Sequence, residues 1–332
     1  MVNIYFKLDL DKGIKHGIGH FFRSIQLYSK LKKLNCIFLV NDTLFLKNLL
    51  KTYYISFPKK IIKFNLANFK KVYQPKDKNI FIFDTLGRDK KFKKFIKNLN
   101  ISNKIISLED RDLFIKYNDV IINSKIDLLN KKSKKKNVFS GIKYTILRFK
   151  KKIRYKKLPA KKKYKILICS GGADYKKLLF KVASILLKFK NIETTCVVGP
   201  SVKKKDQIFN LSKKYSKLKL VTKTYKLEKN FKKNDIIITS GGTMMIESIF
   251  FSKPTYVVET FKHQKSIVKF FRKKKLIHFL GTIEEINNKK IENFVNNLNS
   301  KNKEINRMTR KGYNVIDGKG SIRVYKIIKK ML

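Results

Sequence analysis

The chain has 332 residues, 43% of them hydrophobic, which is enough for two domains that each bury a core and excludes wholesale disorder. Its 80 lysines and arginines against 23 acidic residues give a formal charge of +57. The lysines are spread along the whole chain, while Ile, Asn, Phe and Tyr are abundant and Trp is absent. We therefore attribute the charge to an A+T-rich genome rather than to a selected polyanion site, although it should favour phosphorylated ligands.

No stretch of the sequence is typical of a signal peptide or a membrane span, so we expect a cytoplasmic protein. The three cysteines, Cys36, Cys169 and Cys196, lie in apolar runs without metal-ligand spacing and are expected to be reduced core thiols. Phosphate-binding P-loops, zinc-protease motifs and serine-esterase motifs are missing, so we expect no metal and no cofactor.

The first third alternates β-rich runs with helical patterns. Strands are expected at VNIYFKLDL, CIFLV, NIFIF, KIISL and DVIIN, with helices from about His20 to Leu34, from about Thr43, and near Lys90 to Leu99. Strands separated by helices of this length predict a parallel sheet with crossover connections. Residues 1–150 are therefore predicted to be an N-terminal Rossmann-like domain.

A lysine-rich stretch from about Ser124 to Tyr164, interrupted by the apolar YTILRF, is interpreted as the connection between domains. The alternation then restarts with KILIC, TTCVV, KLVTK, DIIIT and TYVVE as strand candidates, and Ser321 is a candidate N-cap of a closing helix. Residues 151–332 are predicted to be a second Rossmann-like domain. The expected fold class is α/β, with two Rossmann-like domains and a central cleft.

The first strand leads into a glycine-containing turn that carries Gly17 and Gly19, followed at the helix start by His20. Backbone amides at such a turn attract an anion or a sugar, and a neutral imidazole there can act as a general base. A histidine that only caps or packs would suit the same position. The turn matches the dinucleotide-binding fingerprint only weakly, because Phe22 stands where the third glycine would allow close helix–strand packing.

Two Ser-Gly-Gly turns follow apolar strands in the second half, at Ser170–Gly172 and at Ser240–Gly242. Equivalent turns on one sheet would line its edge with amides suited to a pyrophosphate, and Ser240 or Thr243 could cap the next helix. Glu247 lies one helical turn after Thr243, where a carboxylate could accept ribose hydroxyls. The alternative is a surface glutamate paired with one of the many lysines.

Taken together, these segments resemble the UDP-sugar hydrolases of pseudaminic acid synthesis and their spore coat polysaccharide relatives, which are built like glycosyltransferases of the GT-B fold. The matching stretches are GIGHFFR, GIKYTILR, ICSGGAD, ITSGGTMMIESIFFSKP, the pair His263-Gln264, and DGKGSIR. The resemblance implies hydrolysis of a UDP-linked 2,4-diacetamido-2,4,6-trideoxy sugar by water attack at the anomeric carbon, without a metal.

The resemblance also implies roles for particular residues. His20 would be the catalytic base. Residues expected to bind the sugar part of the substrate are Gly17, Gly19, Arg23, Asp84, Tyr144 and Arg148. Residues expected to bind UDP are Ser170, Gly171, Gly172, Ser240, Gly241, Gly242, Thr243, Glu247 and Gln264.

Three departures from the family pattern affect these implications. The segment FDTLGRD keeps Asp84 but lacks the family's tyrosine, the usual Asn-Gln pair is His263-Gln264, and Ser170 replaces an aromatic residue. The expected partner is a UDP-sugar substrate, with no specific nucleic acid, and the basic charge would favour weak peripheral contact with an anionic membrane. A glycosyltransferase of the same architecture is the alternative enzyme, and a nucleic-acid-binding protein is the alternative from another class.

Overall fold

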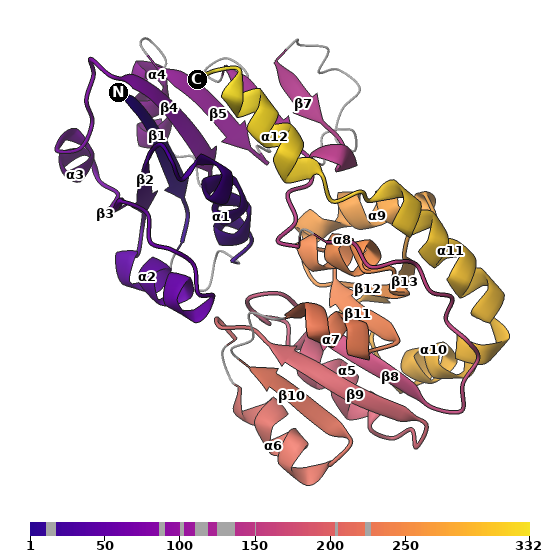
Figure 1. Ribbon diagram of the computed structural model, residues 1–332. Coiled ribbons are helices and arrows are strands. Elements are labelled where there is room, and N and C mark those ends of the chain that lie inside the picture. The colour runs from indigo at the N-terminus through magenta and orange to yellow at the C-terminus, as the bar shows by residue number, and fades with distance from the viewer. Residues whose placement is uncertain are drawn as a thin grey trace. The chain divides into compact units, whose positions relative to one another are not determined.

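The computed structural model describes residues 1–10, 18–85, 90–99, 103–109, 119–124, 137–149, 151–202, 205–222 and 227–332. The chain divides into two compact units. The N-terminal unit comprises Met1–Lys150 together with Gly318–Leu332, and the C-terminal unit comprises Lys151–Asp317. Each unit is built on a parallel β-sheet with helices packed against it (Figure 1).

In the described part of the N-terminal unit, seven strands form one sheet in the order β3-β2-β1-β4-β5-β6-β7, and every pairing is parallel. The strands are β1 (Val2–Leu8), β2 (Asn35–Val40), β3 (Lys60–Lys63), β4 (Lys78–Asp84), β5 (Lys104–Leu108), β6 (Val120–Asn123) and β7 (Val138–Ser140). The helices are α1 (Gly19–Leu31), α2 (Thr43–Thr52), α3 (Leu66–Lys70), α4 (Lys90–Leu99), the 3₁₀ turn η2 (Ile142–Tyr144) and α12 (Gly320–Lys329).

Side-chain alternation along β1 explains why this sheet is buried on both faces. Ile4, Phe6 and Leu8 join a core cluster with α1 and α12, while Tyr5 belongs to a second cluster and stacks on Phe81 at 4.7 Å between ring centroids. A period of two sends successive residues to opposite faces. Apolar residues on both faces are what a parallel sheet covered by crossover helices requires.

The last helix of the chain, α12, belongs to the N-terminal unit. Val324 and Ile328 are fully buried in its core cluster, and α12 contacts α1 and η2. The sequence prediction placed all of residues 151–332 in the second domain, and the structure differs because the apolar stripe of α12 packs on α1. The helix begins at Gly320 after Lys319, without a side-chain cap, so the predicted cap by Ser321 is wrong.

The described strands of the C-terminal unit form a six-stranded sheet in the order β10-β9-β8-β11-β12-β13, again with parallel pairings. The strands are β8 (Tyr164–Cys169), β9 (Ile192–Val198), β10 (Leu218–Thr222), β11 (Ile236–Ser240), β12 (Thr255–Glu259) and β13 (His278–Thr282). The helices are α5 (Leu178–Leu186), α6 (Asp206–Lys214), α7 (Leu227–Lys233), α8 (Thr243–Phe250), the 3₁₀ turn η3 (Lys262–Gln264), α9 (Lys265–Lys273), α10 (Asn288–Ser300) and α11 (Asn302–Val315).

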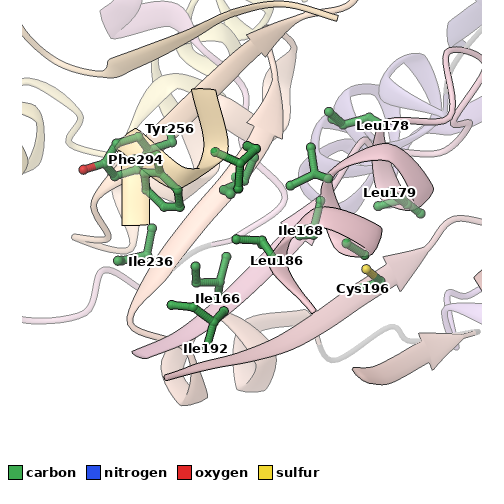
Figure 2. Close-up of a cluster of buried hydrophobic side chains, with 14 of the residues drawn as sticks. Ile166, Ile168, Leu178, Leu179, Leu186, Ile192, Cys196, Ile236, Tyr256 and Phe294 are labelled. Atoms are coloured by element: carbon green, nitrogen blue, oxygen red, sulfur yellow. The ribbon is translucent and has the colours of Figure 1, made fainter. Parts of the chain in front are cut away.

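The core of the C-terminal unit forms where one face of this sheet packs on helices. Figure 2 shows Ile166 and Ile168 of β8 beside Leu186 of α5, with Tyr256 and Phe294 nearby. The rings of Tyr256 and Phe294 meet edge to face at 4.6 Å, which joins β12 to α10. Packing of this kind holds the strand ends in fixed positions and so orients the turns that follow β8 and β11.

The predicted α/β fold class with two Rossmann-like sheets is confirmed. Strands β3, β7 and β13 were not predicted, since each lies at a sheet edge and has few buried residues. Ile146 and Leu147, from the apolar segment interpreted as a connection, are buried, and Ile146 lies in the N-terminal core cluster. In the residues that the structure describes, no helix is both long and apolar enough to cross a membrane.

Candidate functional site

The candidate site in the N-terminal unit lies where the strand order of the sheet reverses. From β1 the chain runs outward through β2 to β3 and then returns to β4 on the other side of β1, so the carboxyl ends of β1 and β4 flank the switch point. Ligands of open α/β sheets bind at this position. Asp84 is the last residue of β4, and His20 lies in the first turn of α1, which follows β1.

His20, Asp84 and Arg23 form a buried hydrogen-bonded triad. His20 Nδ1 lies 2.5 Å from Asp84 Oδ1. Arg23 donates from Nε to Asp84 Oδ2 at 2.9 Å and from Nη2 to Asp84 Oδ1 at 2.7 Å. Asp84 is 0% exposed and His20 is 5% exposed. Because His20 and Arg23 are three residues apart on α1, one helix face presents both to the same carboxylate.

The charge state of Asp84 determines how His20 is protonated. Burial would raise the pKa of Asp84, but the Arg23 guanidinium and His20 outweigh it and hold that pKa well below its usual range. An ionised carboxylate only accepts hydrogen bonds, so His20 must donate from Nδ1. The Nε2 lone pair of a neutral His20 is then available to take a proton. Arg23 Nη2 lies 3.2 Å from His20 Nδ1 because both groups converge on Asp84 Oδ1.

The other predicted sugar-binding residues occupy different parts of this unit. Arg148 lies against α1, with its Cζ 4.7 Å from the centroid of the Phe22 ring and its carbonyl oxygen accepting from Gln26 Nε2. Tyr144 ends η2 and packs against the core cluster that contains α1. Gly19 is the first residue of α1, and Gly17 lies outside the described residues.

Asp84 and Arg23 were predicted to bind substrate, and the structure places both in contact with His20. Arg23 and His20 engage both carboxylate oxygens of Asp84, and Arg23 uses two of its nitrogens on that carboxylate. This arrangement suits a pair that positions His20, and substrate binding by Asp84 and Arg23 stays a prediction. Nothing in the local sequence FDTLGRD distinguishes a buried orienting aspartate from one that binds substrate.

Glu109 is a residue of this edge that the sequence prediction missed. It follows β5, adopts a left-handed conformation with φ of +52°, and its Oε1 accepts from the Ser124 hydroxyl at 2.6 Å. Its charge also raises the pKa of Arg23, after the larger opposing effect of burial and the contribution of Asp84. An acidic residue directly after the apolar run KIISL is the signal that could have found it.

The C-terminal unit places its two Ser-Gly-Gly turns at the corresponding switch point. Strands β8 and β11 are neighbours, and Ser170 and Ser240 stand at their carboxyl ends. Ser240 Oγ donates to the Ser170 carbonyl oxygen at 3.3 Å, which ties the turns together. Gly171 takes a φ of +95°, a conformation that favours glycine. The predicted pairing of these turns on one sheet edge is therefore present.

Gly199, which follows β9, makes close packing of the first turn feasible. A Cβ atom at this position would lie 2.4 Å from the carbonyl oxygens of both Gly171 and Gly172. The amide of Ser201 also donates to the Gly172 carbonyl oxygen at 2.9 Å. The loop after β9 therefore supports the turn from one side. Its sequence signal was the glycine in VVGP directly after a predicted strand.

Gln264 lies beside the second turn. A Cβ atom at Gly241 would lie 3.1 Å from Gln264 Cβ and 2.4 Å from Val268 Cγ2. Gln264 is 7% exposed, and its Oε1 accepts from the amide and hydroxyl of Thr260 at 3.0 and 3.1 Å. These bonds fix the amide group of Gln264 next to Gly241.

Helix α8 begins directly after the second turn. Its N-cap is Gly242, with no side-chain cap, so the prediction that Ser240 or Thr243 caps this helix is wrong. Thr243 is instead the first helical residue. The positive end of the α8 dipole and its first amides therefore lie beside the Ser-Gly-Gly turn, an arrangement that suits an anion.

Glu247 is buried in α8, at 3% exposure. Glu247 is therefore not the surface residue that the alternative interpretation required. Among the residues that the structure describes, there is no group of three or more His, Cys, Asp or Glu side chains that could hold a metal ion.

No protein-family model matches this chain. The chain is similar to the uncharacterized protein MJ1062 of Methanocaldococcus jannaschii, with 30% identity over 275 residues, which is 75% of this chain and 54% of that protein. The match thus spans about half the length of that relative. It is also similar to the spore coat polysaccharide biosynthesis protein SpsG of Bacillus subtilis, with 25% identity over 258 residues and 76% of each chain.

Solved structures resemble the whole chain at low sequence identity. MurG of Acinetobacter baumannii matches with a TM-score of 0.68 at 13% identity, covering 99% of both chains. The S. aureus MnaA–UDP structure matches with a TM-score of 0.65 at 15% identity, covering 99% of this chain and 96% of the other. The protein therefore has an α/β fold with two parallel Rossmann-like sheets, the GT-B fold.

Proposed function

We propose that this protein is an enzyme that binds a UDP-linked sugar and hydrolyses it, with His20 as the general base. The observation that carries the proposal is the buried coupling of His20 to Asp84 and Arg23 at the switch point of the N-terminal sheet. The likeness to a spore coat polysaccharide biosynthesis protein and to a structure determined with UDP supports this class of substrate.

The triad suits general base catalysis. With Nδ1–H donated to Asp84, Nε2 of His20 can accept a proton from water. The water oxygen forms a bond to the anomeric carbon, the bond from that carbon to the diphosphate oxygen breaks, and UDP leaves with the electron pair. The proton ends on His20 Nε2, and the Asp84 carboxylate stabilises the resulting imidazolium.

The C-terminal unit supplies groups that suit the UDP part of the substrate. The backbone amides of Ser170–Gly172 and Ser240–Gly242, with the first turn of α8, can stabilise the negative charge that develops on the leaving diphosphate. In this proposal Thr243 and Gln264 complete the surroundings of the phosphates, and Glu247 accepts ribose hydroxyls from the same helix. In this proposal Arg148, Tyr144 and Gly19 contact the sugar.

The finer proposal is that the sugar is a 2,4-diacetamido-2,4,6-trideoxy hexose, in the synthesis of a surface glycan of the pseudaminic acid type. It is tested by NMR with UDP-2,4-diacetamido-2,4,6-trideoxy-β-L-altrose in EDTA and without an acceptor. Release of UDP and free sugar is the expected result. UDP binding without turnover would contradict hydrolysis of this sugar and direct the search to another UDP-sugar or to transfer onto an acceptor.

His20→Ala tests the mechanism in the same assay. We expect turnover to fall about 10²- to 10⁴-fold, because the base is removed, while the affinity for UDP stays the same because the Ser-Gly-Gly turns are unchanged. Circular dichroism controls for folding. Full activity in a folded variant would show that His20 is not the base.

A further inference from the structure

The C-terminal unit contains a cavity that the proposed reaction does not use. It has a volume of about 540 Å³ and lies between α11 and the chain segment that follows Lys151. Its walls carry Tyr155, Lys157, Arg307, Arg310, Lys311 and Asn314. None of these residues belongs to the Ser-Gly-Gly turns or to the helices that follow them.

Asn306 fixes the two walls of this cavity to each other. Its Nδ2 donates to the Leu158 carbonyl oxygen at 2.8 Å, and its Oδ1 accepts from the Leu158 amide at 2.7 Å. The hydroxyl of Tyr155 donates to the Asn306 carbonyl oxygen at 3.2 Å. Asn306 is 6% exposed, so these bonds are shielded from water. The cavity is therefore a preformed feature of the unit.

The polar lining of the cavity is strongly cationic. Arg307, Arg310 and Lys311 follow the spacing i, i+3, i+4, which places them on one face of α11, and Lys157 faces them from the other wall. None of the lining residues is acidic. In the described part of the chain, none of these four side chains forms a salt bridge. Their mutual repulsion is relieved when an anion enters.

The arginines distinguish this cavity from the rest of the surface, where the positive charge comes mainly from lysines. The sequence contains nine arginines, which leaves 71 lysines among the 80 basic residues. A lysine at any surface position is therefore uninformative, whereas two of the nine arginines lie in this one cavity. The planar guanidinium binds phosphate oxygens through two parallel hydrogen bonds, which an ammonium group is unable to do.

We propose that this cavity is a second anion site, which binds a phosphate-bearing ligand through the side chains of Arg307 and Arg310. The guanidinium groups lie one helical turn apart, so each can engage phosphate oxygens of the same ligand, while Lys157 and Lys311 add charge and Asn314 adds an amide donor. The ligand is a small phosphorylated molecule or the head group of an anionic phospholipid, since both present the same oxygens.

The experiment compares three double variants by calorimetric titration with inorganic pyrophosphate at about 0.15 M salt, where surface charges are screened beyond about 8 Å. R307Q/R310Q removes both guanidinium groups. R307K/R310K keeps the charge but removes the planar guanidinium groups that form two parallel hydrogen bonds. K213Q/K214Q removes the same charge from two exposed lysines of α6, elsewhere on the same unit (Figure 1). All three leave the Ser-Gly-Gly turns intact, so any pyrophosphate bound there contributes equally.

A loss of about tenfold or more in affinity for R307Q/R310Q, a smaller loss for R307K/R310K and none for K213Q/K214Q would support the proposal and identify a small phosphorylated ligand. Sedimentation with phosphatidylcholine vesicles, with and without phosphatidylglycerol, tests the lipid source with the same variants. If the variants lose binding in the same order only with vesicles that contain phosphatidylglycerol, the ligand is a lipid head group. Equal loss in the control variant, or no loss in either assay, would overturn the proposal.

Discussion

At the scale of single residues, Asp84 tests how the proposed base His20 is positioned. Asp84→Asn keeps the side-chain shape but places an amide NH₂ against a hydrogen-bond donor, because Arg23 and His20 donate to both oxygens. His20 then loses the acceptor that fixes its tautomer. We expect kcat to fall about 10²- to 10⁴-fold, with KM for the UDP-sugar little changed.

The matched control is Asp77→Asn, which alters an aspartate that precedes β4 and pairs with the N-terminal amine. Its kcat should equal that of the wild type. An unchanged kcat in Asp84→Asn would show that the carboxylate does not position the base.

His278 provides a prediction about stability. Burial lowers the pKa of His278 to about 4, with Lys301 adding to the shift and Glu304 opposing it. No hydrogen-bond partner of its Nε2 lies among the described residues, and its ring stacks on Tyr256 at 4.6 Å. The unfolded chain, with a pKa of about 6.5, therefore takes up the proton first as the pH falls.

The contribution of His278 to the free energy of unfolding should therefore be fully present above pH ~6.5. It should fall by roughly 2 to 3 kcal/mol as the pH is lowered towards ~4. His278→Phe keeps a stacking ring without a titratable group, so urea unfolding at several pH values should show a shallower acid dependence. His263→Phe, at an exposed position on η3, is the control and should leave the slope unchanged. A slope unaffected by His278→Phe would contradict this assignment.

At the scale of elements, the sequence predicted the central strands and the edge strand β10, and missed the edge strands β3, β7 and β13. Runs such as KILIC and DIIIT are apolar throughout because both faces of a parallel sheet are covered, and β8 and β11 lie there. The short edge strand β3 has the sequence KIIK and contains no buried residue, so its pattern resembles that of a loop. Contacts between distant segments, such as Arg23 with Asp84, depend on strand order, which local patterns do not encode.

The Ser-Gly-Gly turns could also be predicted from local sequence, since each directly follows an apolar strand. The local sequence did not show that the loop after β9 packs against the first of these turns. Gly199 tests this packing, because a methyl group there would meet two carbonyl oxygens of the first turn. We expect Gly199→Ala to lower the free energy of unfolding by about 1 to 3 kcal/mol and to weaken UDP binding by displacing the turn.

Gly242→Ala is the comparison for stability, because a Cβ atom there lies 4.0 Å from Ser240 Oγ and meets no closer atom. It should unfold at nearly the wild-type temperature. Thermal unfolding and titration with UDP measure the two effects. If Gly199→Ala retained both stability and affinity, close packing of the β9 loop on the turn would be unnecessary for the site.

At the scale of the whole molecule, the two units repeat one design. Each sheet reverses its strand order once next to its first strand, and each reversal carries the polar residues that the sequence singled out. The N-terminal switch point carries the histidine triad and the C-terminal one carries the glycine turns, so the proposed base and the proposed phosphate-binding turns arise at equivalent positions. This correspondence follows from topology and explains why the motifs follow strands in both halves.

The chain returns to the N-terminal unit through α12, so the stability of that unit depends on how α12 packs in its core. Ile328 is 0% exposed within the N-terminal core cluster, whereas Ile322 on the same helix is 43% exposed. We expect Ile328→Ala to cost about 2 to 4 kcal/mol and Ile322→Ala less than about 0.5 kcal/mol.

Hydrogen exchange followed by mass spectrometry distinguishes which unit is affected. In Ile328→Ala, amides of β1 and α1 should exchange faster, because α12 packs on α1, while amides of β8 and β11 should keep their wild-type rates. Faster exchange in both units, or equal effects of the two substitutions, would contradict the assignment of α12 to the N-terminal unit.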